Sequence, residues 1–169
     1  KAYAKTVLEN PQGRLWTVQG FGKLSTNITD NARFHIWDRV LLNPRVPAVH
    51  SHSWDFHSVV LAGCMRNLRL EEGDGDAWNK VLVASTGGLI SEPALSALSE
   101  YLVEIHREED EYKQAAEEIH WSLPDDGTVT LVEWAFGPTP QHMKVFWRGR
   151  VPWADAKPRQ ATDAEILSV

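Results

Sequence analysis

The sequence contains a single cysteine, Cys64, in 169 residues, so it cannot form an internal disulfide. A fold without disulfides does not depend on an oxidising compartment, and we expect a cytoplasmic protein. No apolar run approaches the length of about 18 residues that a membrane span needs. The first ten residues also lack the apolar core of a secretory signal. The sequence therefore predicts no membrane association.

Positive charge is also scarce. The chain has 17 Lys and Arg against 23 Asp and Glu, which gives a formal net charge of −6, and it has no basic run. Nucleic acids and anionic membranes are held chiefly by patches of Lys and Arg. The composition argues against both as partners.

Hydrophobic residues, by contrast, are abundant enough for a substantial core, at 43% of the chain. The length is typical of one compact domain. We expect a single domain over residues 1–169, with a core from about residue 33 to 148 and both terminal segments packed outside it. The eight tryptophans fit either a large aromatic core or a pocket with aromatic walls.

Short β-branched and aromatic segments, separated by Gly, Pro and Asn turns, predict a series of strands. They are expected at residues 14–18, 20–24, 33–42, 50–61, 65–70, 78–84, 101–106, 119–123, 128–136 and 143–147. Residues 65–70 are expected to pair with 50–61 after a turn at Gly63. Such strands hide their edges best in a closed or sandwiched antiparallel sheet. The predicted fold class is therefore all-β, a small antiparallel β-barrel of the double-stranded β-helix or jelly-roll type with a few short helices.

Helices are expected at a few places. Ser91, followed by Glu92-Pro93, has the pattern of an N-cap with proline in the first turn and predicts a helix to about Glu100. Residues 107–118 are charged and compatible with a helix. Residues 2–9 predict a short helix, and Thr162 with Glu165 forms a capping-box pattern that predicts a last one. Residues 71–76 are read as an acidic turn.

Three of the seven histidines fall within eight residues, in His-Ser-His-Ser-Trp-Asp-Phe-His from His50 to His57. On an extended strand, His50 and His52 point to the same side. Neutral imidazole is the commonest protein ligand for divalent transition metals. The pair alone fits a metal site and a hydrogen-bonded core histidine equally well.

The segment resembles the first motif of the cupin superfamily, which has two histidines one residue apart, then a glutamate, then a turn glycine. His50 and His52 are the pair, His57 stands where the glutamate would fall, and Gly63 is the turn. His120 would be the lone histidine of the second motif. The resemblance covers roughly residues 34–147, and His-Ser-His-Ser-Trp-Asp-Phe also resembles a phrase of small uncharacterised bacterial and phage cupins.

This resemblance implies a β-barrel that holds a metal through His50, His52 and His120. Three imidazoles leave open positions on a divalent iron for substrate and oxygen. Three-histidine cupins include thiol, diketone-cleaving and gentisate-type dioxygenases, so the expected function is an Fe(II) dioxygenase acting on a small molecule. Zn, Mn and Ni are alternative metals. Two other functions stay open: a non-catalytic binding or sensor module, and a metal-free isomerase or epimerase with His52 or His57 as base.

Three residues are catalytic candidates. His57 is a fourth ligand or a general base, unless it is an ordinary barrel histidine. Glu118, two residues before His120, offers a carboxylate ligand or base, unless it lies on a solvated surface. Tyr112 is placed to donate to substrate or bound oxygen, or else lies at the rim.

Five further residues are expected around the ligands or the substrate. Asp55 is expected to orient a ligand histidine or to stabilise a turn, and Trp54 to line the cavity. Arg39 and Arg66 match a substrate carboxylate, although surface salt bridges explain them equally well. His106 is expected behind the ligands or at the surface. His35 and His142 are left outside the predicted site, and a homodimer through an edge strand stays an open alternative.

Overall fold

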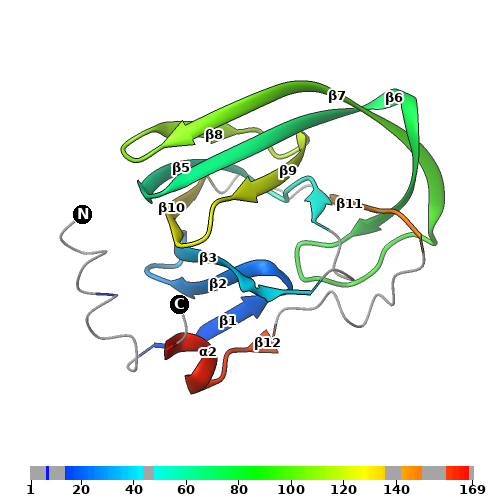
Figure 1. Ribbon diagram of the computed structural model, residues 1–169. Helices are drawn as coiled ribbons and strands as arrows, with labels where there is room; N and C mark the ends of the chain where they lie inside the picture. The colour runs from blue at the N-terminus through cyan, green and yellow to red at the C-terminus, as the bar shows by residue number, and fades with distance from the viewer. Residues whose placement is uncertain (1–6, 8–13, 44–47, 136–141, 150–158, 168–169) are drawn as a thin grey trace.

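The computed structural model describes residues 7, 14–43, 48–135, 142–149 and 159–167, and every structural statement below concerns these parts of the chain. Two antiparallel sheets pack against each other in a jelly-roll-like arrangement (Figure 1). The predicted all-β class with few helices is confirmed.

Each sheet mixes strands from distant parts of the sequence. The first sheet contains, in spatial order, β12 (Arg159–Gln160), β1 (Trp16–Gln19), β2 (Phe21–Asn27), β3 (Ala32–Leu42), β10 (Thr128–Ala135), β5 (Asp55–Ala62) and β8 (Glu111–Gln114). The second contains β11 (Met143–Trp147), β4 (Val49–His50), β9 (Ile119–Pro124), β6 (Cys64–Val83) and β7 (Ala94–Arg107), and β11 also pairs with β6. The described helix α2 (Asp163–Leu167) lies beside the first sheet. The sequence predicts that the core begins at about residue 33, but β1 and β2, which precede that residue, also belong to the first sheet.

Alternation along β3 explains how the first sheet buries both of its faces. Phe34 and Ile36 pack with Leu24 in the larger hydrophobic cluster, against which Ile166 of α2 also packs. Complete burial of Phe34 contributes roughly 1.5–3 kcal/mol. Trp37 lies on the opposite face of β3 and lines a cavity. One face of the sheet therefore supplies the core and the other supplies the site.

The chain passes from the first sheet to the second at Gly63. This residue has φ +79°, and a Cβ on it would lie 2.7 Å from Thr128 Oγ1. Glycine is needed because it adopts this left-handed conformation and leaves room for Thr128. The predicted pairing across Gly63 is wrong, since β5 pairs with β10 and β8 whereas β6 pairs with β9, β7 and β11.

The predicted helix from Ser91 to about Glu100 is also wrong. Residues 94–107 form β7, which pairs with β6 from Lys80↔Ala94 to Cys64↔Arg107. The long partner strand supplies the backbone hydrogen bonds and overrides the local helix signal. Pro93, which has no N–H, falls just before this ladder.

Residues 107–118 are likewise not helical. Glu109 has φ +77°, and the Arg107 backbone N–H donates to Asp110 Oδ2 at 2.7 Å, so the chain turns there. β8 then pairs with β5. The predicted acidic turn at residues 71–76 lies within β6, where the register against β7 shifts between Glu72 and Asp76.

The last predicted helix is confirmed as α2. Thr162 Oγ1 accepts the Glu165 N–H at 3.3 Å, and Glu165 Oε2 accepts the Thr162 N–H at 2.9 Å, as a capping box requires. The predicted helix at residues 2–9 lies outside the described residues except for Val7. No helix in the described ranges combines the length and the apolarity that crossing a membrane would need.

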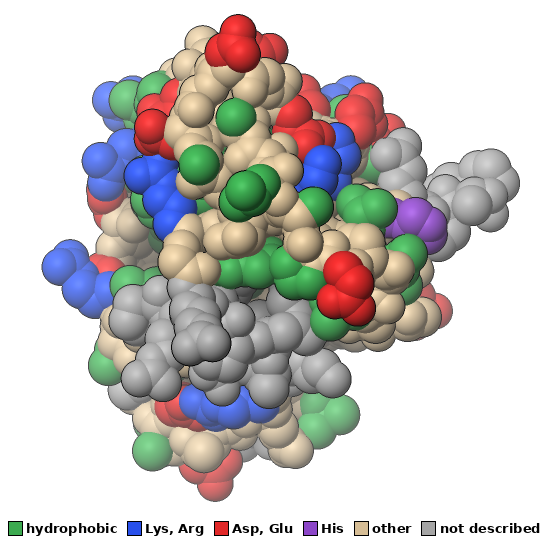
Figure 2. Space-filling view, turned by 90° about the vertical axis from the view of Figure 1, so that its right-hand side faces the viewer, with side chains coloured by type: hydrophobic (Ala, Val, Ile, Leu, Met, Phe, Trp, Pro, Cys, Tyr) green, Lys and Arg blue, Asp and Glu red, His purple; other side chains and the backbone are tan. Residues whose placement is uncertain are grey.

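The strand β7 forms one edge of the second sheet and exposes hydrophobic side chains, namely Leu95, Tyr101, Leu102, Val103 and Ile105. On the face shown in Figure 2, hydrophobic side chains lie among acidic and basic ones. An exposed edge strand is a template for pairing with another chain. The homodimer through an edge strand stays a prediction.

Candidate metal centre

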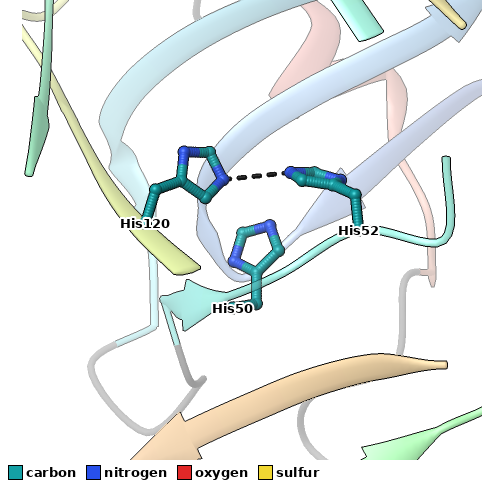
Figure 3. A group of neighbouring side chains, drawn as sticks. All are labelled: His50, His52 and His120. Carbon is teal, nitrogen blue, oxygen red and sulfur yellow. Dashed lines mark hydrogen bonds between the residues drawn. The ribbon is translucent and has the colours of Figure 1, made fainter. Parts of the chain in front are cut away.

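His50, His52 and His120 meet at one point (Figure 3), with their ligating nitrogens all within 4.8 Å of one another. His50 ends β4, and the register of the β4–β9 pair places it directly opposite His120. β4 stops at His50, so His52 is not on the same strand as expected, yet the two rings lie only 4.8 Å apart between centroids. Strand pairing brings His120 to two residues that lie about seventy positions earlier.

Backbone hydrogen bonds fix the short segment after β4. The His52 N–H donates to the Ala116 carbonyl at 2.8 Å, and the Ala116 N–H donates to Asp55 Oδ1 at 2.7 Å. Between the histidines, the Ser51 N–H donates to the Lys144 carbonyl at 2.9 Å, and the Lys144 N–H donates to Ser51 Oγ at 2.9 Å. These two hydrogen bonds hold the segment against β11. Asp55 therefore positions His52 through the backbone of Ala116.

The hydrogen bond of His50 leaves one of its nitrogens free for a metal, and the other two rings bring a nitrogen of each close together. His50 Nδ1 lies 3.0 Å from the Ala48 carbonyl, which only accepts, so Nδ1 carries the proton and Nε2 is free to ligate. His52 Nε2 and His120 Nε2 share a hydrogen bond of 3.0 Å, so one of the two carries a proton that moves to the other ring nitrogen when both bind a metal. Two nitrogens bound at roughly 2.1 Å to one metal, at right angles, also lie about 3 Å apart. The donor set thus fits a divalent transition metal.

Burial keeps all three imidazoles neutral near pH 7. It lowers the pKa of His50 to about 4, a shift that the hydrogen bond to Ala48 partly offsets and the charge of Lys23 adds to. Burial and then repulsion from His50 hold the pKa of His52 and of His120 well below the usual value of 6.5. Protons therefore do not compete with a metal for these nitrogens at neutral pH.

The lowered pKa of His50 predicts that the metal-free protein loses stability in acid. Below pH 6.5 the unfolded chain takes up a proton on this residue, whereas the folded chain does so only near pH 4. The free energy of unfolding should fall between these two pH values by at most about 1.4 kcal/mol per pH unit for each such histidine. Urea denaturation of the chelator-treated protein from pH 7 to 4 measures this slope. His50→Gln should flatten it, and an unchanged slope in that variant would contradict the prediction.

The three histidines lie on the wall of a cavity of about 830 Å³ between the two sheets. Aromatic side chains form much of the remaining wall: Phe21, Trp37, Trp54, Phe56, Tyr112 and Trp134. A cavity of this size, mostly apolar with a few polar groups, is typical of a small-molecule site. Three of the eight tryptophans, Trp37, Trp54 and Trp134, therefore line a pocket, as one of the two expectations for these residues predicted.

Two of the other predicted site residues reach this cavity, Trp54 and Tyr112. Burial raises the pKa of Tyr112, so its phenol stays protonated and is able to donate. Asp55 acts on the backbone near His52, as described above. Trp54 and Tyr112 therefore lie on the cavity wall and Asp55 lies beside it, and their roles stay predictions.

The structure places His57 outside the histidine cluster. In β5, Phe56 lines the cavity, and alternation turns His57 to the opposite face. There its Nε2 lies 3.1 Å from Glu111 Oε2. His57 is close in sequence to His50 and His52, but its side chain does not line the cavity.

Both predicted arginines lie on the surface. Arg39 pairs with Asp126, and Arg66 pairs with Asp125 at 3.1 Å. Neither lines the cavity within the described ranges. The surface salt-bridge alternative therefore describes them.

Glu118 and His106 also contact other groups. Glu118 Oε2 lies 3.2 Å from a nitrogen of Arg69 and accepts the Ala115 N–H at 2.8 Å. His106 stacks on Tyr112, with ring centroids 4.2 Å apart, and thus lies behind a cavity residue. Neither belongs to the cavity wall in the part of the chain that is described.

Sequence reasoning missed three polar residues on the first sheet: Lys23, Arg33 and His35 line the cavity. Alternation along β3 places Arg33 and His35 on the same face as Trp37. Lys23 reaches the wall because β2 pairs with β3 and aligns it with Trp37, and no short motif in the sequence marks that pairing.

No protein-family model matches this chain, and comparison with curated proteins gives no match.

Proposed function

We propose that this chain is a cupin-like, metal-dependent enzyme that holds Fe(II) through His50, His52 and His120 and oxidises a small molecule with dioxygen. The observation that carries this proposal is the meeting of three neutral imidazoles, one buried and two half-buried, on the wall of a cavity of about 830 Å³. Support for the cupin assignment comes from the two packed antiparallel sheets and from the His-x-His pair opposite a third histidine. Zn, Mn and Ni are alternatives for the same ligands.

Fe(II), when bound, would supply a redox centre with positions for both dioxygen and substrate. The protein's own residues bind and orient the substrate. Phe21 and Trp37 pack 6.0 Å apart between centroids on the first sheet, and Phe56 lies 4.7 Å from the ring of His52. These apolar walls exclude water from the space beside the histidines.

Tyr112 is a hydrogen-bond donor on this wall. Its phenol stays protonated because burial raises its pKa. The stacked ring of His106 limits how far the tyrosine ring turns. We assign to Tyr112 a hydrogen bond to the substrate in the cavity.

Oxygen uptake tests the enzymatic part of the proposal. Protein loaded with Fe(II) under argon is mixed with air-saturated buffer and a panel of thiols, 1,3-diketones and dihydroxylated aromatics. We expect uptake that needs both iron and one class of substrate, and that disappears in His52→Ala. Uptake that persists in His52→Ala, or no uptake with any member of the panel, would contradict oxygenase chemistry; in the second case a ligand-binding role would explain the cavity better.

A further inference from the structure

The wall of the cavity opposite the histidine strands carries two cations. In the pairing of β2 with β3, Lys23 lies opposite Trp37, and Asn27 lies opposite Arg33. Residues two apart on a strand share a face, so Lys23 and Arg33 both project on the face that lines the cavity. Two positive charges on one wall repel each other, so an anion bound between them would be stabilised.

Lys23 is almost completely buried, with 8% of its surface exposed. Its Nζ lies 4.9 Å from the centroid of Phe21 and 5.1 Å from that of Trp37. Within the described residues no carboxylate forms an ion pair with it. Burial, and then repulsion from Arg33, lowers the pKa of Lys23 from 10.5 to about 7. A buried ammonium without a counter-ion is costly, and the two rings compensate for only part of that cost.

Arg33 is held in place but is not neutralised. Its Nε donates to Asn27 Oδ1 at 2.8 Å, and its guanidinium lies 4.8 Å from the centroid of Trp134. Among the residues described, no carboxylate forms an ion pair with it. Its planar terminal nitrogens match the two oxygens of a carboxylate.

A third polar group on this wall, His35, has one ring nitrogen near Thr130 Oγ1 at 3.5 Å and the other without a partner in the ranges that the structure describes. His35, which is 5% exposed, lies between Lys23 and Arg33 in the register and has an Nε2 that is buried without a hydrogen bond among the described residues. An unpaired buried polar atom is unfavourable unless a ligand or a water completes it. Asp30 also borders the cavity, but it is exposed and forms no ion pair with either cation.

We infer that Lys23 and Arg33, with His35 between them, bind the carboxylate of the substrate, so that the substrate class is a small organic acid with an apolar body. The aromatic walls would take the apolar body. The inference names the substrate class of the proposed enzyme and in that sense rests on the proposed function. The three imidazoles are neutral, so a divalent ion would keep its charge and favour an anionic ligand further.

The test compares acids with their uncharged amides. Benzoate, phenylacetate and 3-phenylpropionate are titrated calorimetrically into the chelator-treated protein beside benzamide, phenylacetamide and 3-phenylpropionamide. We expect at least one acid to bind about tenfold or more tightly than its amide. Lys23→Met should reduce this preference to less than about threefold, because the ammonium is lost while its apolar volume stays. Lys23→Arg should retain most of it, and Arg39→Gln, which changes a surface arginine, should leave it unchanged.

Equal binding of acids and amides, absence of binding by all three acids, or an undiminished preference in folded Lys23→Met would each overturn the inference. Arg33→Gln provides a second variant if Lys23→Met does not fold, and it should also weaken the preference. Iron content is measured separately on the same proteins. A protein that prefers acids but binds no iron would refute the proposed function alone, whereas one that binds iron without preferring acids would refute this inference alone.

Discussion

Replacing His120 by alanine is expected to lower the iron content of the reconstituted protein from about one atom per chain to less than about a tenth. His120 is buried, and its Nε2 lies 3.0 Å from that of His52. Changes in groups that merely orient a ligand weaken metal binding by about 10–100-fold, so loss of a ligand should cost at least the upper end of that range. Elemental analysis after desalting measures the content, and His50→Ala should have the same effect.

His57→Ala is the matched control. His57 is the third histidine of the motif, but it faces away from the cavity and pairs with Glu111. Its variant should keep iron at the level of the unchanged protein. Full iron occupancy in a folded His50→Ala/His120→Ala double variant would refute the assignment of the ligands.

Replacing Arg69 by methionine is expected to lower the free energy of unfolding by about 3 kcal/mol. The Arg69 side chain is 4% exposed, and its guanidinium lies 2.6 Å from Glu104 Oε2 and 3.2 Å from Glu118 Oε2. Methionine retains much of the volume but leaves two carboxylates without their cation. They are partly exposed, which is why we expect the low end of the range of 3–5 kcal/mol for broken buried pairs. Urea denaturation gives the value.

Arg66→Met, three residues earlier on β6, is the control for that experiment. Arg66 is exposed and pairs with Asp125 at the surface, so its loss should cost no more than about 1 kcal/mol. Equal effects of the two substitutions would contradict the buried role of Arg69. Glu118 also accepts the Ala115 N–H next to Ala116, the residue that holds His52. Arg69→Met should therefore weaken iron binding as well, whereas Arg66→Met should not.

Much of the architecture follows from local pattern. Alternating hydrophobic residues in β3 predict which side chains face the core, because a strand repeats every two residues. The capping pattern of Thr162 and Glu165 predicts α2 for the same local reason. Two sequence motifs predict the three histidines of the cavity, and the pairing of β4 with β9 brings them together.

The predictions that are wrong concern residues whose structure depends on pairing with segments distant in the sequence. The residues from Ser91 to Glu100 carry a helix signal, but β6 offers a continuous ladder that they join as part of β7. His57 stands where the resembled motif has its glutamate, whereas alternation in β5 turns it to the face away from the cavity. Lys23 and His35 reach the cavity because β2 pairs with β3, and no short motif marks that pairing.

The most direct test of the central claim is the X-ray absorption spectrum of the protein loaded with one equivalent of Fe(II). The account predicts the scattering of three imidazoles around the iron, because His50, His52 and His120 offer three nitrogens within 4.8 Å of one another. It also predicts that this imidazole signal is lost in His120→Ala. Iron surrounded by oxygen ligands alone, or an imidazole signal unchanged in His120→Ala, would contradict it.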